Sequence, residues 1–174
     1  MKTTRTIVPL ALAALALAPA AVAATIYGTT GDDRIEGTAG PDYIEARAGN
    51  DLVYGLAGAD VLVGGGGLDR LHGGYGADEV RGGAWDDYLT GGPGGDNLRG
   101  ERGADNLTGG TGHDILSTGS GYDWVHAGPG NDVVESADGD GAEDFIFCGD
   151  GYDTVEADRT DLVQGTCEDV VFIP

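Results

Sequence analysis

A nine-residue repeat occupies most of this chain. Residues 28–135 divide without remainder into twelve blocks of nine, and two further blocks cover residues 139–156 after a three-residue interruption. The sixth position is Asp in all fourteen blocks, and the eighth is Ile, Val or Leu in all fourteen. The fourth is Gly except at Trp85 and Ala142. Because each block must adopt the same local structure, the chain is predicted to fold as a stacked array.

Each block contains the chemistry of one turn and one short strand. Positions one to six are rich in glycine, which accepts positive φ angles and close approach of neighbouring chains. Positions seven to nine place one aliphatic residue between two outward residues, so we expect a three-residue strand. A strand this short is not stable alone. Two blocks are therefore expected to form one coil, with coils stacking about 4.8 Å apart into two parallel sheets.

The aliphatic residues at position eight are the predicted core of this array. Each coil contributes only two of them, so the core is thin. The predicted core residues are Ile35, Ile44, Val53, Leu62, Leu71, Val80, Leu89, Leu98, Leu107, Leu116, Val125, Val134, Ile146 and Val155.

The aspartates at position six are the candidate metal ligands. Stacking places Asp33, Asp51, Asp69, Asp87, Asp105 and Asp123 in one column, and Asp42, Asp60, Asp78, Asp96, Asp114 and Asp132 in the opposite column; Asp144 and Asp153 hold the same position in the last two blocks. Like charges stacked a few ångströms apart repel each other, and a divalent cation between successive turns reverses that interaction. Carboxylates and backbone carbonyls suit Ca²⁺, whereas Mg²⁺ demands stricter geometry and soft metals prefer other ligands.

Two blocks carry the repeat in its complete form: GGGGLDRLH at residues 64–72 and GGTGHDILS at residues 109–117. They match the pattern G-G-x-G-x-D-x-U-x, so the chain resembles the RTX (hemolysin-type) calcium-binding nonapeptide repeat family. The resemblance implies an all-β fold, a parallel β-roll (a right-handed β-solenoid) with several Ca²⁺ ions between stacked turns. It also implies that the position-six aspartates and carbonyls of the glycine region are the ligands.

Some blocks depart from the pattern. Residues 37–38, residues 46–47 and Thr118 replace one or both leading glycines, and we expect weaker or absent calcium binding around these turns. The same expectation applies to Trp85 and Ala142 at position four, where a side chain conflicts with the backbone angle that glycine allows.

The N-terminus has the composition of an export signal. Lys2 and Arg5 precede an apolar run over residues 7–18, and Ala21-Val22-Ala23 is a cleavage site of small residues. We therefore predict that residues 1–23 are a signal peptide and that the protein is secreted. The alternative, a membrane anchor, is disfavoured because a span needs about 20 apolar residues.

The other end leaves the register of the repeat. We expect a roll of about 14 repeats over residues 24–156, followed by a C-terminal cap over residues 157–174 with an apolar run at Val170–Ile173. Cys148 and Cys167 are nineteen residues apart, close to one coil. Their stacking distance suits a disulfide, the usual state of a cysteine pair in an exported protein.

The charge of the chain limits its partners. Without the two cations of the signal, seven arginines face 30 acidic residues, a formal charge of −23. This excludes nucleic acid and anionic membrane surfaces as natural partners and favours cations. Self-repulsion should expand the metal-free chain, so calcium binding is expected to drive folding.

The sequence offers little for catalysis. His72 and His126 lie three coils apart, His113 lies in a turn, and no G-x-S-x-G nucleophile motif occurs. The acidic pairs Asp86-Asp87 and Glu143-Asp144 each combine a repeat aspartate with a solvated neighbour. We therefore predict a calcium-binding protein without enzymatic activity; a hydrolase would need a cleft with convergent acids.

One alternative function stays open, a calcium-stabilised adhesion or matrix scaffold whose outer face binds a surface or a protein partner. Trp124, Phe145, Phe147 and the tyrosines could form that face. Scattered exposed aromatic residues are normal in soluble proteins, and the sequence favours that interpretation.

Overall fold

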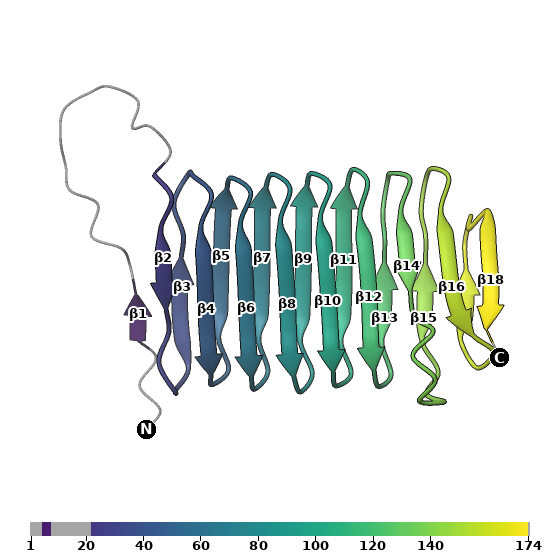
Figure 1. Ribbon diagram of the computed structural model, residues 1–174, viewed down its shortest axis with the longest axis horizontal. Coiled ribbons are helices and arrows are strands. Elements are labelled where there is room, and N and C mark those ends of the chain that lie inside the picture. Colours follow the sequence, from purple (N-terminus) through teal and green to yellow (C-terminus); the bar gives the residue numbers. More distant parts are fainter. Residues whose placement is uncertain (1–4, 8–21, 174) are drawn as a thin grey trace.

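The protein folds as a flat, elongated stack of coils, with two parallel sheets back to back and turns along both edges (Figure 1). The computed structural model describes residues 5–7 and 22–173, and within these ranges there is no helix. Successive strands alternate between the sheets, so each coil carries one strand of each. Through the regular repeats, partner residues in neighbouring strands are eighteen positions apart, as in Leu62 with Val80. The predicted parallel β-roll with two repeats per coil is confirmed.

One sheet, the odd sheet, holds the odd-numbered strands, and the other, the even sheet, holds the even-numbered strands. The odd sheet contains β1 (Arg5–Ile7), β3 (Asp33–Glu36), β5 (Leu52–Ala57), β7 (Arg70–Tyr75), β9 (Tyr88–Pro93), β11 (Asn106–Thr111), β13 (Trp124–His126), β15 (Phe145–Phe147) and β17 (Leu162–Gln164). The even sheet contains β2 (Thr25–Tyr27), β4 (Tyr43–Ala48), β6 (Val61–Gly66), β8 (Glu79–Ala84), β10 (Asn97–Arg102), β12 (Ile115–Ser120), β14 (Val133–Glu135), β16 (Thr154–Asp158) and β18 (Asp169–Ile173).

The interior strands are longer than the repeat pattern predicts. Each strand from β4 to β12 has six residues, because it continues through positions one to three of the next block. The prediction of three-residue strands was therefore wrong for the interior coils. Position two takes a positive φ, for example +114° at Gly74, and the chain still pairs beyond it. The turn proper is reduced to positions four to six.

The core is the predicted line of position-eight residues, all of them fully buried or nearly so. Four side chains at position one extend it, namely Ala46, Thr118, Ala127 and Cys148, which are also buried. The repeat pattern did not predict this second row. In the other ten blocks position one is glycine, so the row is only partly filled.

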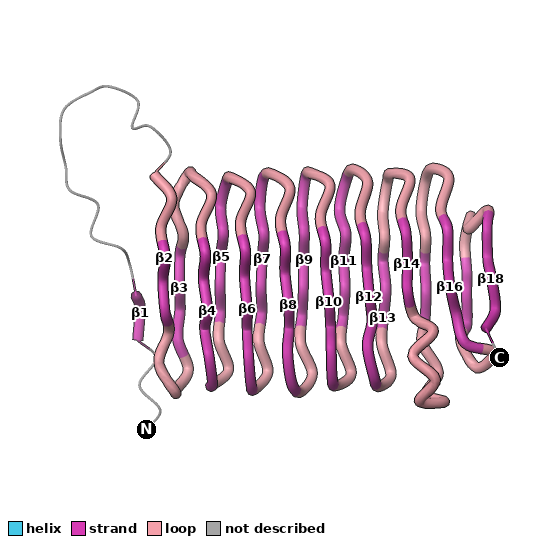
Figure 2. Tube along the Cα trace, in the orientation of Figure 1, coloured by secondary structure: helices cyan, strands magenta, loops and turns pink. Residues whose placement is uncertain are grey.

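The three-residue interruption in the repeat does not break the stack. Residues 136–144 bulge beyond the row of turns between β14 and β15 (Figure 2). The sheets then resume, with Val125 of β13 paired to Ile146 of β15. An insertion confined to one turn leaves the hydrogen-bonded register of the strands intact.

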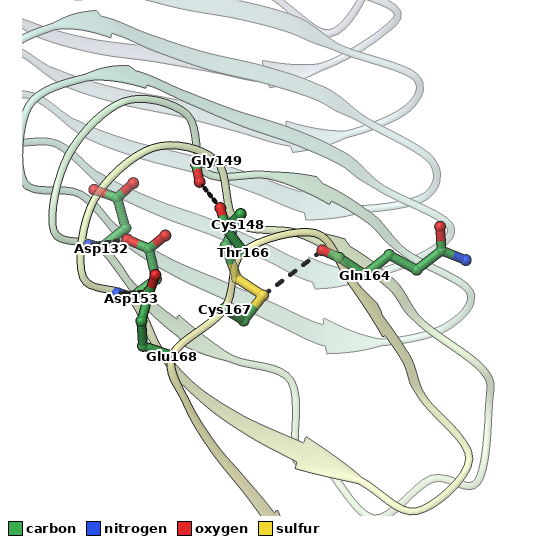
Figure 3. The surroundings of a disulfide bond; sticks show 8 residues. All are labelled: Asp132, Cys148, Gly149, Asp153, Gln164, Thr166, Cys167 and Glu168. Atoms are coloured by element: carbon green, nitrogen blue, oxygen red, sulfur yellow. Dashed lines mark hydrogen bonds between the residues drawn. A yellow bond between two sulfur atoms is a disulfide. The ribbon is translucent and has the colours of Figure 1, made fainter.

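The C-terminal segment continues the even sheet. β18 pairs in parallel with β16 and is the edge strand. Val170 packs against the core, whereas Val171 and Phe172 are each 49% exposed. The cap therefore closes the stack by strand pairing. The predicted disulfide between Cys148 and Cys167 joins this segment to the preceding coil, with 5.4 Å between the Cα atoms (Figure 3).

The predicted signal peptide lies mostly outside the described residues, which omit 1–4 and 8–21. Of that segment, Arg5–Ile7 form β1, parallel to β3. Signal cleavage stays a prediction. A search of the described residues finds no helix long and apolar enough to cross a membrane.

Candidate metal centre

The position-six aspartates form two continuous hydrogen-bonded ladders. In each column the backbone N–H of one aspartate donates to Oδ1 of the aspartate in the next coil, at 2.7 to 2.9 Å through the repeats. All fourteen side chains are at most 3% exposed. The predicted columns are therefore confirmed as geometry, and the three-residue interruption merely lengthens one step of each ladder to 21 residues.

In most of these aspartates the second carboxylate oxygen, Oδ2, has no hydrogen-bond donor. Within the described chain, Oδ2 is buried and receives no hydrogen bond in eleven of the fourteen: Asp51, Asp60, Asp69, Asp78, Asp87, Asp96, Asp105, Asp114, Asp123, Asp132 and Asp153. A buried carboxylate oxygen without a donor is costly unless a cation or a proton neutralises it.

A backbone carbonyl of the next coil faces the same point as this oxygen. Around Gly64, a Cβ atom would stand 2.5 Å from Oδ2 of Asp69 and 2.6 Å from the carbonyl oxygen of Gly82. The same arrangement recurs around Gly55, where Oδ2 of Asp60 and the carbonyl oxygen of Gly73 both lie 2.5 Å from that point. In these two blocks a side chain at position one would displace one of these oxygens, whereas the blocks of Asp51, Asp123, Asp132 and Asp153 accommodate a side chain there. A carboxylate oxygen without a donor and a carbonyl oxygen beside it form a suitable environment for a hard cation.

Burial raises the pKa of the interior carboxyls in the metal-free fold. It raises the pKa of Asp51 to about 6, of Asp69 to about 7 and of Asp87 to about 8. Burial is the largest cause, the hydrogen bond from the N–H of the preceding ladder residue opposes it, and neighbouring carboxylates add to it. The pKa is raised for the same leading reason in Asp60, Asp78, Asp96, Asp105, Asp114, Asp123, Asp132 and Asp144.

The donor set fits calcium better than a soft metal. Among the described residues, no group of three or more His, Cys, Asp or Glu side chains converges on one point. A cation in these turns would therefore complete its shell with backbone carbonyls, and an all-oxygen shell is the one that Ca²⁺ prefers.

The first coil satisfies its aspartates differently. The Thr29 amide and hydroxyl both donate to Oδ2 of Asp33, at 2.6 and 3.0 Å. The Thr38 amide donates to Oδ2 of Asp42 at 2.5 Å, and its hydroxyl donates to Oδ1 at 3.0 Å. These two predicted ligands lie in their columns, but protein donors already occupy the oxygen that is unpaired in the interior.

Two residues that were not predicted end the ladders. Asp161 accepts the N–H of Asp144 at 3.1 Å and a hydrogen bond from the Ser136 hydroxyl, and Glu168 accepts the N–H of Asp153. Asp161 opens a shortened repeat, which was a usable signal. No sequence pattern indicates the role of Glu168, because that role depends on how the last coil returns to the stack (Figure 3).

Several departures from the repeat place ordinary residues in glycine geometry. Trp85 has φ +86°, which confirms the expected conflict at position four. Arg47, Leu56 and Glu101 at position two have φ between +77° and +85°, of which only Arg47 was noted from the sequence. Residues with a Cβ atom adopt such angles at a cost of about 1–3 kcal/mol.

The histidines do not converge. His72 lies on β7 and His126 on β13, with β9 and β11 between them in the sheet. His113 is exposed, and its Nδ1 accepts the N–H of Asn131 at 3.0 Å. Asp86 has a similar place, accepting the N–H of Ala104 at 2.9 Å. These position-five side chains hold neighbouring turns together.

The fold and its ladders define a parallel β-solenoid built from stacked acidic turns. The profile of the RTX calcium-binding nonapeptide repeat family matches residues 27–62, 54–89, 81–116, 90–125, 108–142 and 123–155. The chain belongs to this family. A search of curated proteins finds no match to this sequence.

Proposed function

We propose that this protein is a secreted, non-catalytic calcium-binding roll that folds when several Ca²⁺ ions bind between its stacked turns. The observation that carries the proposal is the set of eleven buried Oδ2 atoms without a donor. When bound, Ca²⁺ supplies positive charge that removes repulsion between carboxylates. The aspartates contribute one oxygen from each turn, and the glycine-region carbonyls supply further oxygens.

The first coil is left out of this calcium set, because Thr29 and Thr38 donate to the Oδ2 atoms of Asp33 and Asp42, the oxygen that is open in the interior; Oδ1 of Asp33 stays buried without a donor. The proposed ligands are the eleven interior aspartates, with Asp144 at the margin, since its Oδ2 is not among the buried oxygens that lack a donor. Extracellular calcium modules bind with dissociation constants of about 10⁻⁴–10⁻³ M, so the chain would fold only after export.

The test is calorimetry and circular dichroism during a calcium titration, with Mg²⁺ as the control cation. The wild type should change from coil to β-structure with Ca²⁺ and not with Mg²⁺. Asp69→Asn with Asp105→Asn should lower the number of ions bound.

The matched control is Asp33→Asn with Asp42→Asn, which changes the same repeat position in the first coil. This control should keep the wild-type stoichiometry. If both double variants lose the same number of ions, the distinction between the coils is wrong. A β spectrum unaffected by EDTA would contradict calcium-driven folding itself.

A second candidate, an adhesion or matrix scaffold, is favoured by the outer face of the odd sheet. Among residues that flank the central aliphatic of each odd-sheet strand from β3 to β17, Glu36 is the only acid, and it is paired with Arg34. Aromatic rings gather there: Trp124 stacks on Phe145 at 4.8 Å, and His126 stacks on Phe147 at 5.1 Å.

A face nearly free of acids is unexpected in a chain of this charge, and it suits an uncharged or acidic extracellular partner. A groove of about 290 Å³ lined by Tyr54, Leu56 and Tyr75 lies on this face. Attachment of the calcium-loaded protein to extracellular surfaces should fall with Trp124→Ala and persist with Trp85→Ala, whose side chain lies in a turn. Equal attachment of both variants would remove this candidate.

A further inference from the structure

The even ladder begins at a residue that would become the new chain end on export. The backbone N–H of Ala24 donates to Oδ1 of Asp42 at 2.6 Å. Ala24 stands eighteen residues before Asp42, so it takes the place that an aspartate amide takes in every later coil. Its carbonyl accepts the N–H of Tyr43 at 2.8 Å, and its side chain packs against the core. Ala24 is therefore fixed on both sides of its Cα atom.

The predicted signal cleavage falls between Ala23 and Ala24. Hydrolysis of that bond consumes one water, leaves a carboxylate on Ala23, and converts the Ala24 amide nitrogen into an α-ammonium group. We propose that this ammonium forms an ion pair with the buried carboxylate of Asp42 and anchors the first coil. The inference rests on the proposed export, and it does not depend on calcium binding.

The surroundings of Asp42 suit a cation of this kind. The carboxylate is 3% exposed, and its other contacts are the Thr38 amide and hydroxyl, both neutral donors. A hydrogen bond between charged groups is stronger than one from a neutral amide. Ala24 is itself partly exposed, so its remaining N–H groups can reach water. The first turn would thus use the chain's own cation where the interior turns use Ca²⁺.

The composition of the processed chain provides a specific probe. Lys2 is the only lysine and is lost with the signal, so the α-amine of Ala24 would be the only primary amine. Acylation by an acetyl N-hydroxysuccinimide ester, followed by mass spectrometry, reports on that group alone. The secreted protein should begin at Ala24, and a different first residue would overturn the proposal.

In the folded, calcium-loaded protein, acetylation should be about tenfold slower than in Asp42→Asn. Asp33→Asn, the matched change in the other column, should leave the rate as in the wild type. Equal rates in the wild type and in Asp42→Asn would overturn the ion pair.

A second measurement covers the case in which Asp42→Asn does not fold. The wild-type chain is acetylated in urea and refolded with calcium, which keeps an N–H at Ala24 but removes its charge. Its urea midpoint should be lower than that of the free-amine chain, with unchanged calcium stoichiometry. An unchanged midpoint would overturn the ion pair, because the neutral hydrogen bond would then stabilise the first coil equally well. If the free-amine chain binds no calcium, the calcium proposal is wrong, and the ion pair is judged on the two urea midpoints alone.

Discussion

The first coil and the interior coils place the same aspartate in two different environments. In the first coil, β2 and β3 end before position two, and the threonine there donates to the carboxylate four residues later. From β4 to β12, position two lies inside a six-residue strand and has a positive φ, and its amide does not donate to Oδ2 of the aspartate. One oxygen of the carboxylate then has no protein donor.

This difference shows which position of the repeat determines whether its aspartate requires a cation. The aspartate is common to all fourteen blocks and cannot be the deciding residue. Thr29 and Thr38 occur where most later blocks have glycine, and a β-branched residue avoids the positive φ found there. Position two therefore decides whether Oδ2 of the aspartate has a protein donor or is open to calcium.

The largest expected effect concerns pH in the absence of calcium. The carboxyls of Asp51, Asp69 and Asp87 have folded-state pKa values of about 6, 7 and 8, above the value of about 3.9 in an unfolded chain. The folded state then binds more protons, so its stability is greatest below about pH 4 and falls as pH rises through the folded-state pKa values. Circular dichroism in EDTA should show β-structure at pH 4 that is lost towards pH 8. More β-structure at pH 8 than at pH 4 would contradict the assigned pKa directions.

A glycine substitution should break an interior turn. Gly76 has φ +135°, and a Cβ there would stand against the carbonyl oxygen of Gly58 in the preceding coil. Gly76→Ala should reduce the free energy of unfolding by about 3 kcal/mol. Gly66→Ala is the control, since nothing lies within 4 Å of its added Cβ. Urea unfolding in calcium measures both, and equal losses would refute the positional argument.

Removing the disulfide should loosen the other end of the stack. Cys148→Ala with Cys167→Ser should cost about 2–4 kcal/mol, because the unfolded chain regains the freedom of a closed loop. Hydrogen exchange should increase in β16 to β18 and stay unchanged in β4 to β8. Uniform acceleration along the stack would mean that the disulfide supports the whole solenoid.

The threonines of the first coil should have a smaller and local effect. Thr29→Val with Thr38→Val removes two hydroxyl donors to buried carboxylates and should cost about 1–2 kcal/mol. Thr90→Val with Thr108→Val, on the odd sheet, should be near neutral. If calorimetry of the first variant shows an additional bound ion, the hydroxyls had been excluding calcium. A loss of bound ions would contradict the assignment of this coil.

The smallest expected effect is a gain in stability. Trp85→Gly removes a bulky side chain from φ +86° and should stabilise the fold by about 1 kcal/mol. Thermal unfolding in saturating calcium measures it, with Trp124→Gly as a control that lacks this backbone benefit. A lower midpoint for Trp85→Gly would mean that the indole contributes packing worth more than the strain.

The sequence predicted the coil, the core and the columns because each depends only on period. An eighteen-residue coil places Leu62 against Val80 and Asp69 against Asp87 whatever the details of the turn. It predicted the disulfide for the same reason, since nineteen residues are close to one coil. It failed where local conformation matters, as in the length of the strands and the positive φ of Leu56 and Glu101.

The repeat by itself determined the architecture, the buried aliphatic line and the family. Only the tertiary structure decided which aspartates are equivalent. A pattern records residue types, whereas satisfaction of a buried carboxylate depends on donors from the neighbouring coil. Ala24, Thr38, Asp161 and Glu168 complete the ladders through contacts between coils or through a local backbone angle, which periodicity does not encode.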